Sequence, residues 1–222
     1  MSEWWTYRLS DILPFSAQTY FRLFELHNAA VWPAQVFALA AGLAIVALLV
    51  TRQPWAGRAV ALLLAAAWAF VAWSYLHARY APINWAAVYF AYAFAAQALL
   101  LVLVSALGGR LRFTGPMSPL PRAGLGMVLF ALLAQPLIGP LLGREWPGVE
   151  LFGIAPDPTV LVTLGVLLAA DRMRIELLAI PFLWCVISGA TLWAMSSPEA
   201  LLMPAAGLIA VALALWRGLR KA

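Results

Sequence analysis

The stretch AAVWPAQVFALAAGLAIVALLV, residues 29–50, contains no charged side chain. A helix needs about 20 apolar residues to cross the hydrocarbon core of a bilayer, so this stretch predicts a membrane span. Six similar runs follow it, at residues 58–75, 83–107, 123–142, 154–170, 175–195 and 200–216. The sequence therefore predicts an all-α integral membrane protein with seven transmembrane helices. Six is the alternative count, because Asp157 and Pro158 fall in the first turn of the fifth run.

The composition agrees with a membrane protein and excludes several other classes. Of the 222 residues, 65% are hydrophobic and 10% are charged. A soluble domain carries about 25% charged residues, so this chain cannot coat a water-facing surface. The net charge of +5 comes from a few loop arginines, which excludes an extended basic surface for nucleic acid. An ordinary soluble enzyme and a disordered chain are excluded for the same lack of charge.

The basic residues predict the orientation of the helices. If the chain has seven spans and its N-terminus lies outside, four basic residues fall outside: Arg8, Arg22, Arg79 and Arg144. Ten fall inside: Arg52, Arg58, Arg110, Arg112, Arg122, Arg172, Arg174, Arg217, Arg220 and Lys221. Inside loops of membrane proteins are enriched in Lys and Arg. The sequence therefore predicts an N-terminus outside and a C-terminus inside.

Residues 1–28 are expected to form an N-terminal interfacial segment on the outer face, before a single helical bundle at residues 29–222. Ser16 is a candidate N-cap for an amphipathic helix. One face of this helix carries Tyr20, Leu23, Phe24 and His27, and the opposite face carries Arg22 and Glu25. Such a helix is typical of an interfacial anchor on the outer leaflet. The alternative is a lid that folds over the mouth of the bundle.

The same N-terminal region resembles an uncharacterised family of bacterial polytopic inner-membrane proteins, a domain of unknown function whose members are sometimes labelled permeases. The resemblance rests on these residues: Trp4-Trp5-Thr6-Tyr7-Arg8, Ser10-Asp11, Phe15-Ser16, Thr19-Tyr20, Arg22-Leu23-Phe24-Glu25-Leu26, Asn28 and Val31-Trp32-Pro33-Ala34-Gln35. It implies a location in the bacterial cytoplasmic membrane, with a periplasmic N-terminus under the predicted topology. It supplies no substrate and no catalytic residue.

Polar residues and prolines inside the spans are the first candidates for a binding site, because each needs a partner in hydrocarbon. Gln97 lies near the middle of the third span and Gln135 near the middle of the fourth. Pro136 follows Gln135 directly, with Gly139 and Pro140 close behind, and this pattern predicts a broken or kinked helix. The two glutamines are either a midplane solute site or simple hydrogen-bonding contacts between helices.

Two other groups of side chains have both a packing and a binding interpretation. Trp85, Tyr89 and Tyr92 follow i, i+4, i+7 spacing and belong either to an interfacial aromatic belt or to an outer vestibule that contacts solute. In the sixth span a stripe contains Pro181, Trp184, Ser188 and Thr191, with Cys185 beside it. We expect this stripe to serve packing, because Ser and Thr usually return their hydroxyls to carbonyls of their own helix.

Few residues are available for cofactors or metals. The single cysteine, Cys185, excludes an intramolecular disulfide and a cysteine-based zinc site. His27 and His77 are both predicted outside and are candidates for a haem pair; the simpler interpretation is that each histidine caps helix carbonyls or hydrogen-bonds interfacial water. We expect no cofactor and no metal site.

The spans are expected to hold no deep carboxylate, because Asp157, Asp171 and Glu176 lie near predicted helix ends. Known catalytic motifs are missing from the sequence, so we expect no enzyme. The first functional hypothesis is a small permease for a neutral solute, contacted by Gln97, Gln135, Pro136, Trp85, Tyr89 and Tyr92. The second is a non-catalytic accessory subunit that packs against another membrane protein or a second copy through alanine-rich helix faces. A water-filled cavity at the two glutamines would favour the permease.

Overall fold

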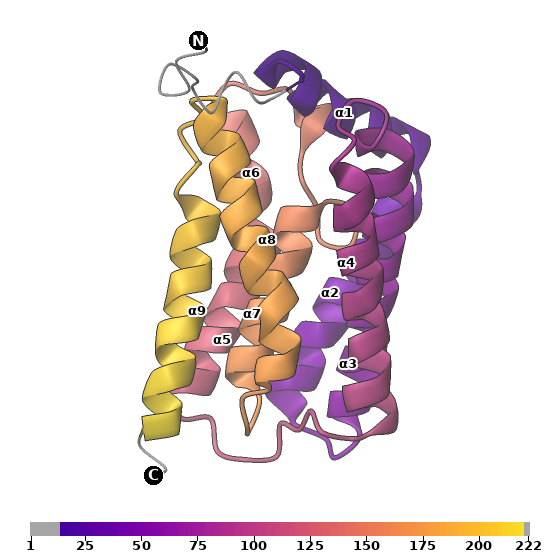
Figure 1. The fold of residues 1–222 in the computed structure, drawn as a ribbon. Coiled ribbons are helices and arrows are strands. Elements are labelled where there is room, and N and C mark those ends of the chain that lie inside the picture. The colour runs from indigo at the N-terminus through magenta and orange to yellow at the C-terminus, as the bar shows by residue number, and fades with distance from the viewer. Residues whose placement is uncertain (1–13, 220–222) are drawn as a thin grey trace.

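The computed structural model describes residues 14–219 and forms a bundle of long, nearly parallel helices (Figure 1). Every element in this part of the chain is helical. Trp4, Trp5, Thr6 and Tyr7 of the N-terminal motif, together with Arg8, Arg220 and Lys221, lie outside the described residues. Five helices are long and apolar enough to cross a membrane: α2 (Ala34–Thr51), Ala56–Tyr80, Ala87–Leu107, Pro119–Leu141 and α8 (Ile175–Ala194). These helices match five of the seven predicted spans.

The other two predicted spans are shorter helices. α7 (Pro156–Ala169) has 14 residues, and α9 (Leu202–Leu219) has its apolar part at Leu202–Arg217. At 1.5 Å per residue, α7 is about 21 Å long, whereas the hydrocarbon core is about 30 Å thick. α7 alone is therefore too short to cross, as the interruption by Asp157 and Pro158 suggests.

Three of the long helices contain wide, π-type turns. α3 (Ala56–Phe70) continues into η3 (Val71–Tyr80), and α4 (Ala87–Leu100) continues into η4 (Leu101–Leu107). The fourth span consists of α5 (Pro119–Leu129), η5 (Phe130–Ala134) and α6 (Gln135–Leu141). The helix therefore continues through Pro136, and the expected break is a local change of helix type. The π-type turn lies directly before Pro136, where the proline lacks an N–H and an ordinary helical hydrogen bond cannot form.

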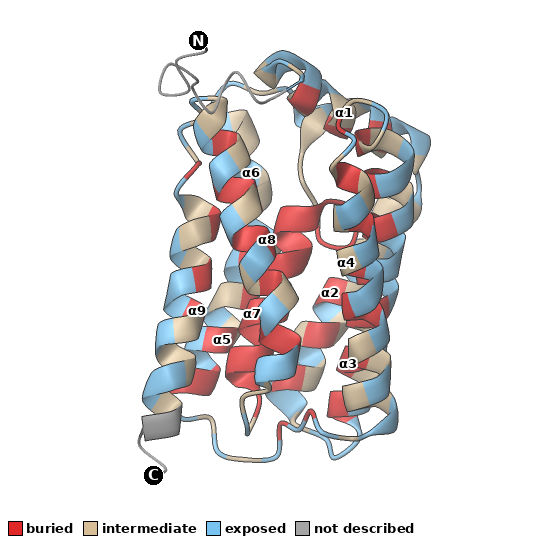
Figure 2. Cartoon of the chain, viewed as in Figure 1, coloured by how far each residue is buried: buried red, intermediate tan, exposed pale blue. Residues whose placement is uncertain are grey.

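α7 occupies the centre of the bundle. All of its residues are buried (Figure 2), and it packs against α5, α8, α9 and α3. The Trp68 indole N–H of α3 donates to the Thr163 hydroxyl at 2.8 Å, which ties α7 to its neighbour through a buried hydrogen bond. Residues 152–155 lead into α7 as a buried, non-helical segment. Its backbone is paired locally, because Gly153 N donates to Thr159 Oγ1, which in turn donates to the Ala155 carbonyl.

α1 (Ala17–Ala30) lies across one end of the bundle, here called the α1 end (Figure 1). The Ser16 side chain accepts from Thr19 N, which confirms the predicted N-cap. The buried side chains of α1 are Tyr20, Phe24 and His27, and their rings contact Tyr75 and Tyr80 of η3. The apolar face of α1 therefore packs on the bundle.

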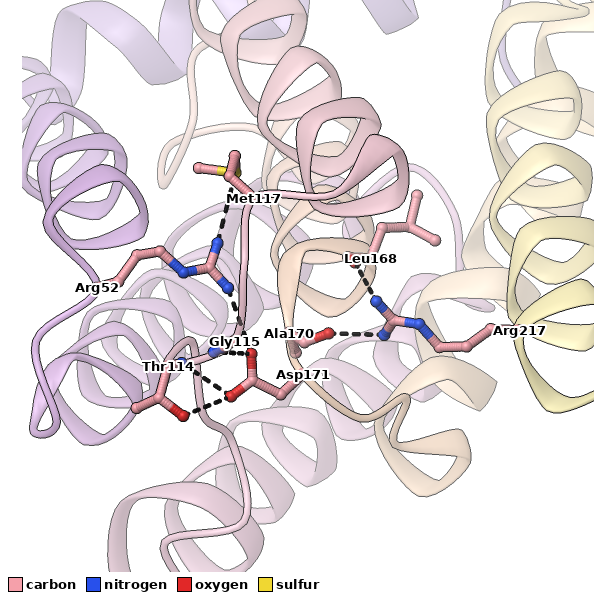
Figure 3. Close-up of polar contacts among 8 residues, drawn as sticks. All are labelled: Arg52, Thr114, Gly115, Met117, Leu168, Ala170, Asp171 and Arg217. Atoms are coloured by element: carbon pink, nitrogen blue, oxygen red, sulfur yellow. Dashed lines mark hydrogen bonds and ion pairs between the residues drawn. The ribbon is translucent and has the colours of Figure 1, made fainter. Parts of the chain in front are cut away.

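The opposite end, here called the arginine end, carries the loops that contain the predicted inside arginines. Asp171 organises this end (Figure 3): its carboxylate accepts from Thr114 N, Thr114 Oγ1 and Gly115 N at 2.8–2.9 Å, and from Arg52 Nη2 at 3.3 Å. Partial burial by itself would raise the pKa of Asp171, but these donors hold that pKa below its ordinary value. The turn at residues 171–174 thus carries charge and also holds three loops together through the hydrogen bonds of Asp171.

The contact between α5 and α7 is close enough to require glycine. A Cβ added at Gly124 would lie 2.5 Å from Ala169 N and from the Gly165 carbonyl oxygen, whereas one added at Gly126 meets nothing within 4 Å. We therefore expect Gly124→Ala to destabilise the protein by about 1–3 kcal/mol through overpacking. Gly126→Ala is expected to be neutral or stabilising by up to about 1 kcal/mol, because alanine is the better helix former.

Thermal unfolding of the two variants in detergent measures this difference. Equal shifts in Tm for Gly124→Ala and Gly126→Ala would contradict the close α5–α7 contact.

Candidate functional site

A small polar cavity, here called the acidic pocket, lies between α6, α7, α8 and α9 towards the α1 end. It has a volume of about 20 Å³. Its ionisable and polar lining residues are Gln135, Arg144, Glu150, Asp157 and Glu199. They come from segments far apart in the sequence, so the cavity exists only in the folded bundle. Polar side chains gathered inside an apolar bundle are the default candidates for function in a membrane protein.

Asp157 lies in the first turn of α7 and is 7% exposed. Its Oδ1 accepts from the Trp184 indole N–H and its Oδ2 from the Ser188 hydroxyl, both at 2.7 Å. Asp157 therefore lies near a helix end, as expected, but its carboxylate is buried inside the bundle. The reason is that α7 is short and buried, so a residue at its N-terminus lies within the bundle. The positive end of the α7 dipole also favours a carboxylate there.

Arg144 is the cation of the acidic pocket. It pairs with Glu199 at 2.8 Å and with Glu150 at 3.8 Å. Burial raises the pKa of the Glu150 carboxyl to about 8; nearby Asp157 raises it further, and Arg144 partly opposes this effect. Two carboxyl groups, those of Glu150 and Glu199, thus pair with one guanidinium, and the raised pKa of Glu150 favours its protonated form near neutral pH.

The acidic pocket contains two acceptors without a donor from the described part of the chain. Gln135 Oε1 and Glu199 Oε2 are buried and lack a hydrogen-bond donor among the described residues. A cavity needs about 10–15 Å³ to accept one water molecule with several polar partners. The acidic pocket is large enough for such a water, and a water between carboxyl groups can pass a proton from one to the other. The arrangement is therefore suited to holding and moving a proton.

Gln97 lies away from this pocket. It is fully buried, and its Nε2 donates to the Leu177 carbonyl near the start of α8 at 3.0 Å. Gln135 instead lines the acidic pocket beside Leu192, near the other end of α8. Fifteen helical residues separate Leu177 from Leu192, or about 22 Å. The two glutamines therefore do not share a cavity, and Gln97 links α4 to α8.

The predicted outer aromatic group faces away from the bundle. Trp85, Tyr89 and Tyr92 are 75%, 63% and 68% exposed. Trp85 and Tyr89 contact each other edge to face at 6.2 Å between ring centroids. Side chains on the outer surface of a membrane bundle meet lipid or interface, as in an aromatic belt. This placement does not bring them to the acidic pocket.

The two histidines are separated. His27 lies on the buried face of α1 and its ring contacts Tyr75. His77, in contrast, is exposed and stacks on Trp73. Burial, and to a smaller extent the charge of Arg79, lowers the pKa of His27 to about 4, so its imidazole is neutral at pH 7. The described residues include no group of three or more His, Cys, Asp or Glu side chains arranged for a metal ion. His27 and His77 therefore do not form a shared ligand pair.

The predicted stripe in the sixth span has two different roles. Thr191 returns its hydroxyl to the Ile187 carbonyl, as expected for packing. Trp184 and Ser188, however, point their donors at Asp157. Two features of the sequence could have indicated this contact. Asp157 is flanked by prolines in the fifth apolar run, and the donors Trp184 and Ser188 follow i, i+4 spacing in the sixth. Arg144, Glu150 and Glu199, which complete the acidic pocket, were missed because they lie in loops.

Comparison with known proteins gives a family but no activity. A family model described as a family of unknown function (DUF6064) matches residues 17–222. No curated protein and no solved structure matches the chain. The predicted resemblance to an uncharacterised family is confirmed.

The hydrogen bonds to Asp157 predict a non-additive pair of substitutions. Ser188→Ala in the native chain removes a donor from a buried carboxylate and should lower stability by about 1–3 kcal/mol. Asp157→Ala leaves two buried donors unpaired and should be more harmful. In the Asp157→Ala background, Ser188→Ala removes an unpaired hydroxyl and should be neutral or stabilising.

Thermal unfolding of the two single variants and the double variant in detergent tests this expectation. Thr191→Ala is the control, since its hydroxyl contacts only its own helix. Additive effects of Asp157→Ala and Ser188→Ala would show that the two side chains do not interact.

The raised pKa of Glu150 predicts a dependence of stability on pH. Between the ordinary carboxyl pKa of 4.5 and about 8, the folded chain holds a proton at Glu150 that the unfolded chain has released. Stability therefore falls as the pH rises through this window. Glu150→Gln removes this contribution, so its Tm should fall less than that of the native chain between pH 5 and pH 8.

The difference between the two curves isolates Glu150 from the other titrating groups. His27 changes stability in the opposite direction. Because its pKa in the folded chain is lowered from 6.5 to about 4, stability rises as the pH rises through this window. Parallel curves for native chain and variant would rule out a raised pKa at Glu150.

Proposed function

Because the chain belongs to the DUF6064 family of unknown function, we propose its function from its own geometry: a small permease of the bacterial cytoplasmic membrane that moves a neutral solute together with a proton. The observation that carries the proposal is the buried Asp157 carboxylate inside the acidic pocket. Membrane-embedded carboxylates of this kind serve as proton relays in pumps and transporters. The permease hypothesis from the sequence is retained, with a different site.

The proposed topology has seven crossings, with the N-terminus periplasmic and the C-terminus cytoplasmic. The fifth crossing combines α7 with residues 152–155, since non-helical backbone is tolerated at membrane depth when protein buries it. The distribution of charge supports this orientation: Arg52, Arg112, Arg172, Arg174 and Arg217 lie on the segments joined at the arginine end, and Arg144 lies at the α1 end. The acidic pocket then lies on the periplasmic side.

The solute is proposed to enter the acidic pocket from the α1 end and to contact Gln135 and Pro136. The volume of about 20 Å³ fits a water molecule, so entry requires α1 and residues 143–150 to move apart. Phe21 of α1 lies under the Arg144 guanidinium at 4.2 Å, and Asn28 donates to the Pro147 and Val149 carbonyls. These contacts support the role of α1 as a lid on the pocket. Gln97, Trp85, Tyr89 and Tyr92 are not part of this proposed site.

We also propose that the chain is not an enzyme. The carboxyl groups of the pocket are held by Arg144, Trp184 and Ser188, and this pairing supports a binding or structural role for them. Its proposed surroundings are the lipid bilayer and no nucleic acid.

The second candidate function is a non-catalytic accessory subunit of a larger membrane complex or of a homo-oligomer. The small volume of the acidic pocket and the buried, helix-linking position of Gln97 favour it. In this case Asp157 fixes α7 to α8 and carries no proton.

Proton uptake by reconstituted protein separates the two candidates. In liposomes with an imposed membrane potential and an internal pH indicator, the native chain should acidify the lumen faster than empty liposomes when a panel of neutral sugars and polyols is present outside. Asp157→Asn should lose this flux, because an amide cannot exchange the proton. Glu150→Gln provides a second variant that keeps the hydrogen bonds of Asp157.

Glu176→Gln is the matched control, since Glu176 is an exposed carboxylate at the start of α8. Its flux should equal that of the native chain. Native protein that never exceeds empty liposomes would overturn the permease and leave the accessory subunit. Flux that survives both Asp157→Asn and Glu150→Gln would overturn the acidic pocket as the proton site.

A further inference from the structure

A second cavity lies at the arginine end, between α8 and α9, and is here called the α8–α9 groove. Its volume is about 890 Å³. The lining is mostly apolar: Met173, Ile175, Leu178, Ala179, Phe182, Val211, Ala214 and Leu215. Two arginines, Arg172 and Arg217, complete it. The groove therefore has a hydrocarbon wall and a cationic mouth.

Close contact between α8 and α9 closes the groove towards the α1 end. A Cβ added at Gly207 would lie 2.9 Å from Cys185 Cβ, and one at Gly189 would lie 2.2 Å from Pro204 Cγ. From this contact the two helices separate towards the arginine end (Figure 1). Ten residues separate Ile175 from Cys185, which is about 15 Å of helix. The groove thus spans about half of a 30 Å hydrocarbon core, the depth of one leaflet.

The two guanidinium groups at the mouth have donors to offer. Arg217 donates to the Ala170 carbonyl at 2.6 Å and the Leu168 carbonyl at 3.5 Å, at the C-terminal end of α7 (Figure 3). A guanidinium has five N–H donors, so others remain for a ligand. Arg172 is exposed and makes no hydrogen bond or ion pair with another described residue. An anion at the mouth would therefore meet two positive charges.

We propose that the α8–α9 groove binds an anionic phospholipid of the cytoplasmic leaflet, with an acyl chain along the apolar wall and its phosphate between Arg172 and Arg217. The leaflet assignment rests on the topology proposed above; the binding chemistry does not. Charge complementarity selects this occupant, since basic pockets between membrane helices at the cytoplasmic side bind acidic headgroups. An apolar helix from a second copy would match the wall and leave the two guanidinium groups without an anion.

Lipid binding is measured on the whole protein purified in mild detergent, by native mass spectrometry and by the shift in Tm on addition of lipid. Phosphatidylglycerol should bind and raise Tm, and phosphatidylcholine, which has the same acyl chains and no net charge, should bind more weakly. Arg172→Gln removes one cation at the surface and should weaken phosphatidylglycerol binding about fivefold. Ala179→Phe should fill the wall and reduce the binding of both lipids.

Arg122→Gln is the matched control, because Arg122 is an exposed arginine in the first turn of α5, outside the groove. It should bind phosphatidylglycerol as the native chain does. Equal binding of the two lipids, or equal effects of Arg172→Gln and Arg122→Gln, would overturn the proposal. A dimer that Ala179→Phe converts to monomer, without bound phospholipid, would identify a second copy as the occupant and would also overturn it. Because these measurements need no membrane orientation and no transport, their outcome is independent of the proposed permease activity.

Discussion

The complete burial of α7 is the constraint on which the rest of the structure depends. A helix of 14 residues at the centre of a bundle cannot reach both ends, so the chain must approach it through buried, non-helical backbone. The Thr159 hydroxyl satisfies two polar groups of this backbone, because it accepts from Gly153 N and donates to the Ala155 carbonyl. The same geometry brings Asp157, which would be a surface residue on a full-length span, into the interior. A polar site inside the bundle is thus a consequence of a short helix.

Both ends of α7 are held by side chains from the last two helices. At its N-terminus, Trp184 and Ser188 of α8 donate to Asp157. At its C-terminus, Arg217 of α9 donates to carbonyls of the final turn, where a cation is also favoured by the helix dipole. Between these ends, Gly124 and Gly165 allow α5 to approach within backbone contact. The N-terminal turn of α7 thus lines the acidic pocket, and its C-terminal carbonyls hold Arg217 of the α8–α9 groove at the opposite end of the bundle.

Much of the fold could be predicted from the sequence because membrane spans depend on length and apolarity, which are properties of each segment alone. Five of the seven apolar runs are helices long enough to cross a membrane, the other two are shorter helices, and Ser16 is the predicted N-cap. The site was harder to predict, since it depends on which residues of different segments meet. Gln97 and Gln135 look equivalent in the sequence, yet one links α4 to α8 and the other lines a cavity. Asp157 was visible as an acid near Pro158, but its burial follows from packing that periodicity does not report.

The position of α1 illustrates the same limit and bears on access to the site. An apolar helix face is equally suited to a lipid surface and to the end of a bundle, so its pattern alone leaves both open. In the folded chain the choice follows from aromatic partners: Tyr20 contacts Tyr80 and Phe24 stacks on Tyr75 at 4.8 Å. Once α1 rests there, Phe21 reaches the Arg144 guanidinium, which also pairs with Glu199 and Glu150. Any displacement of α1 therefore changes the environment of the guanidinium that pairs with these two carboxyl groups. In the proposed permease, displacement of α1 would in this way change the proton affinity of the acidic pocket.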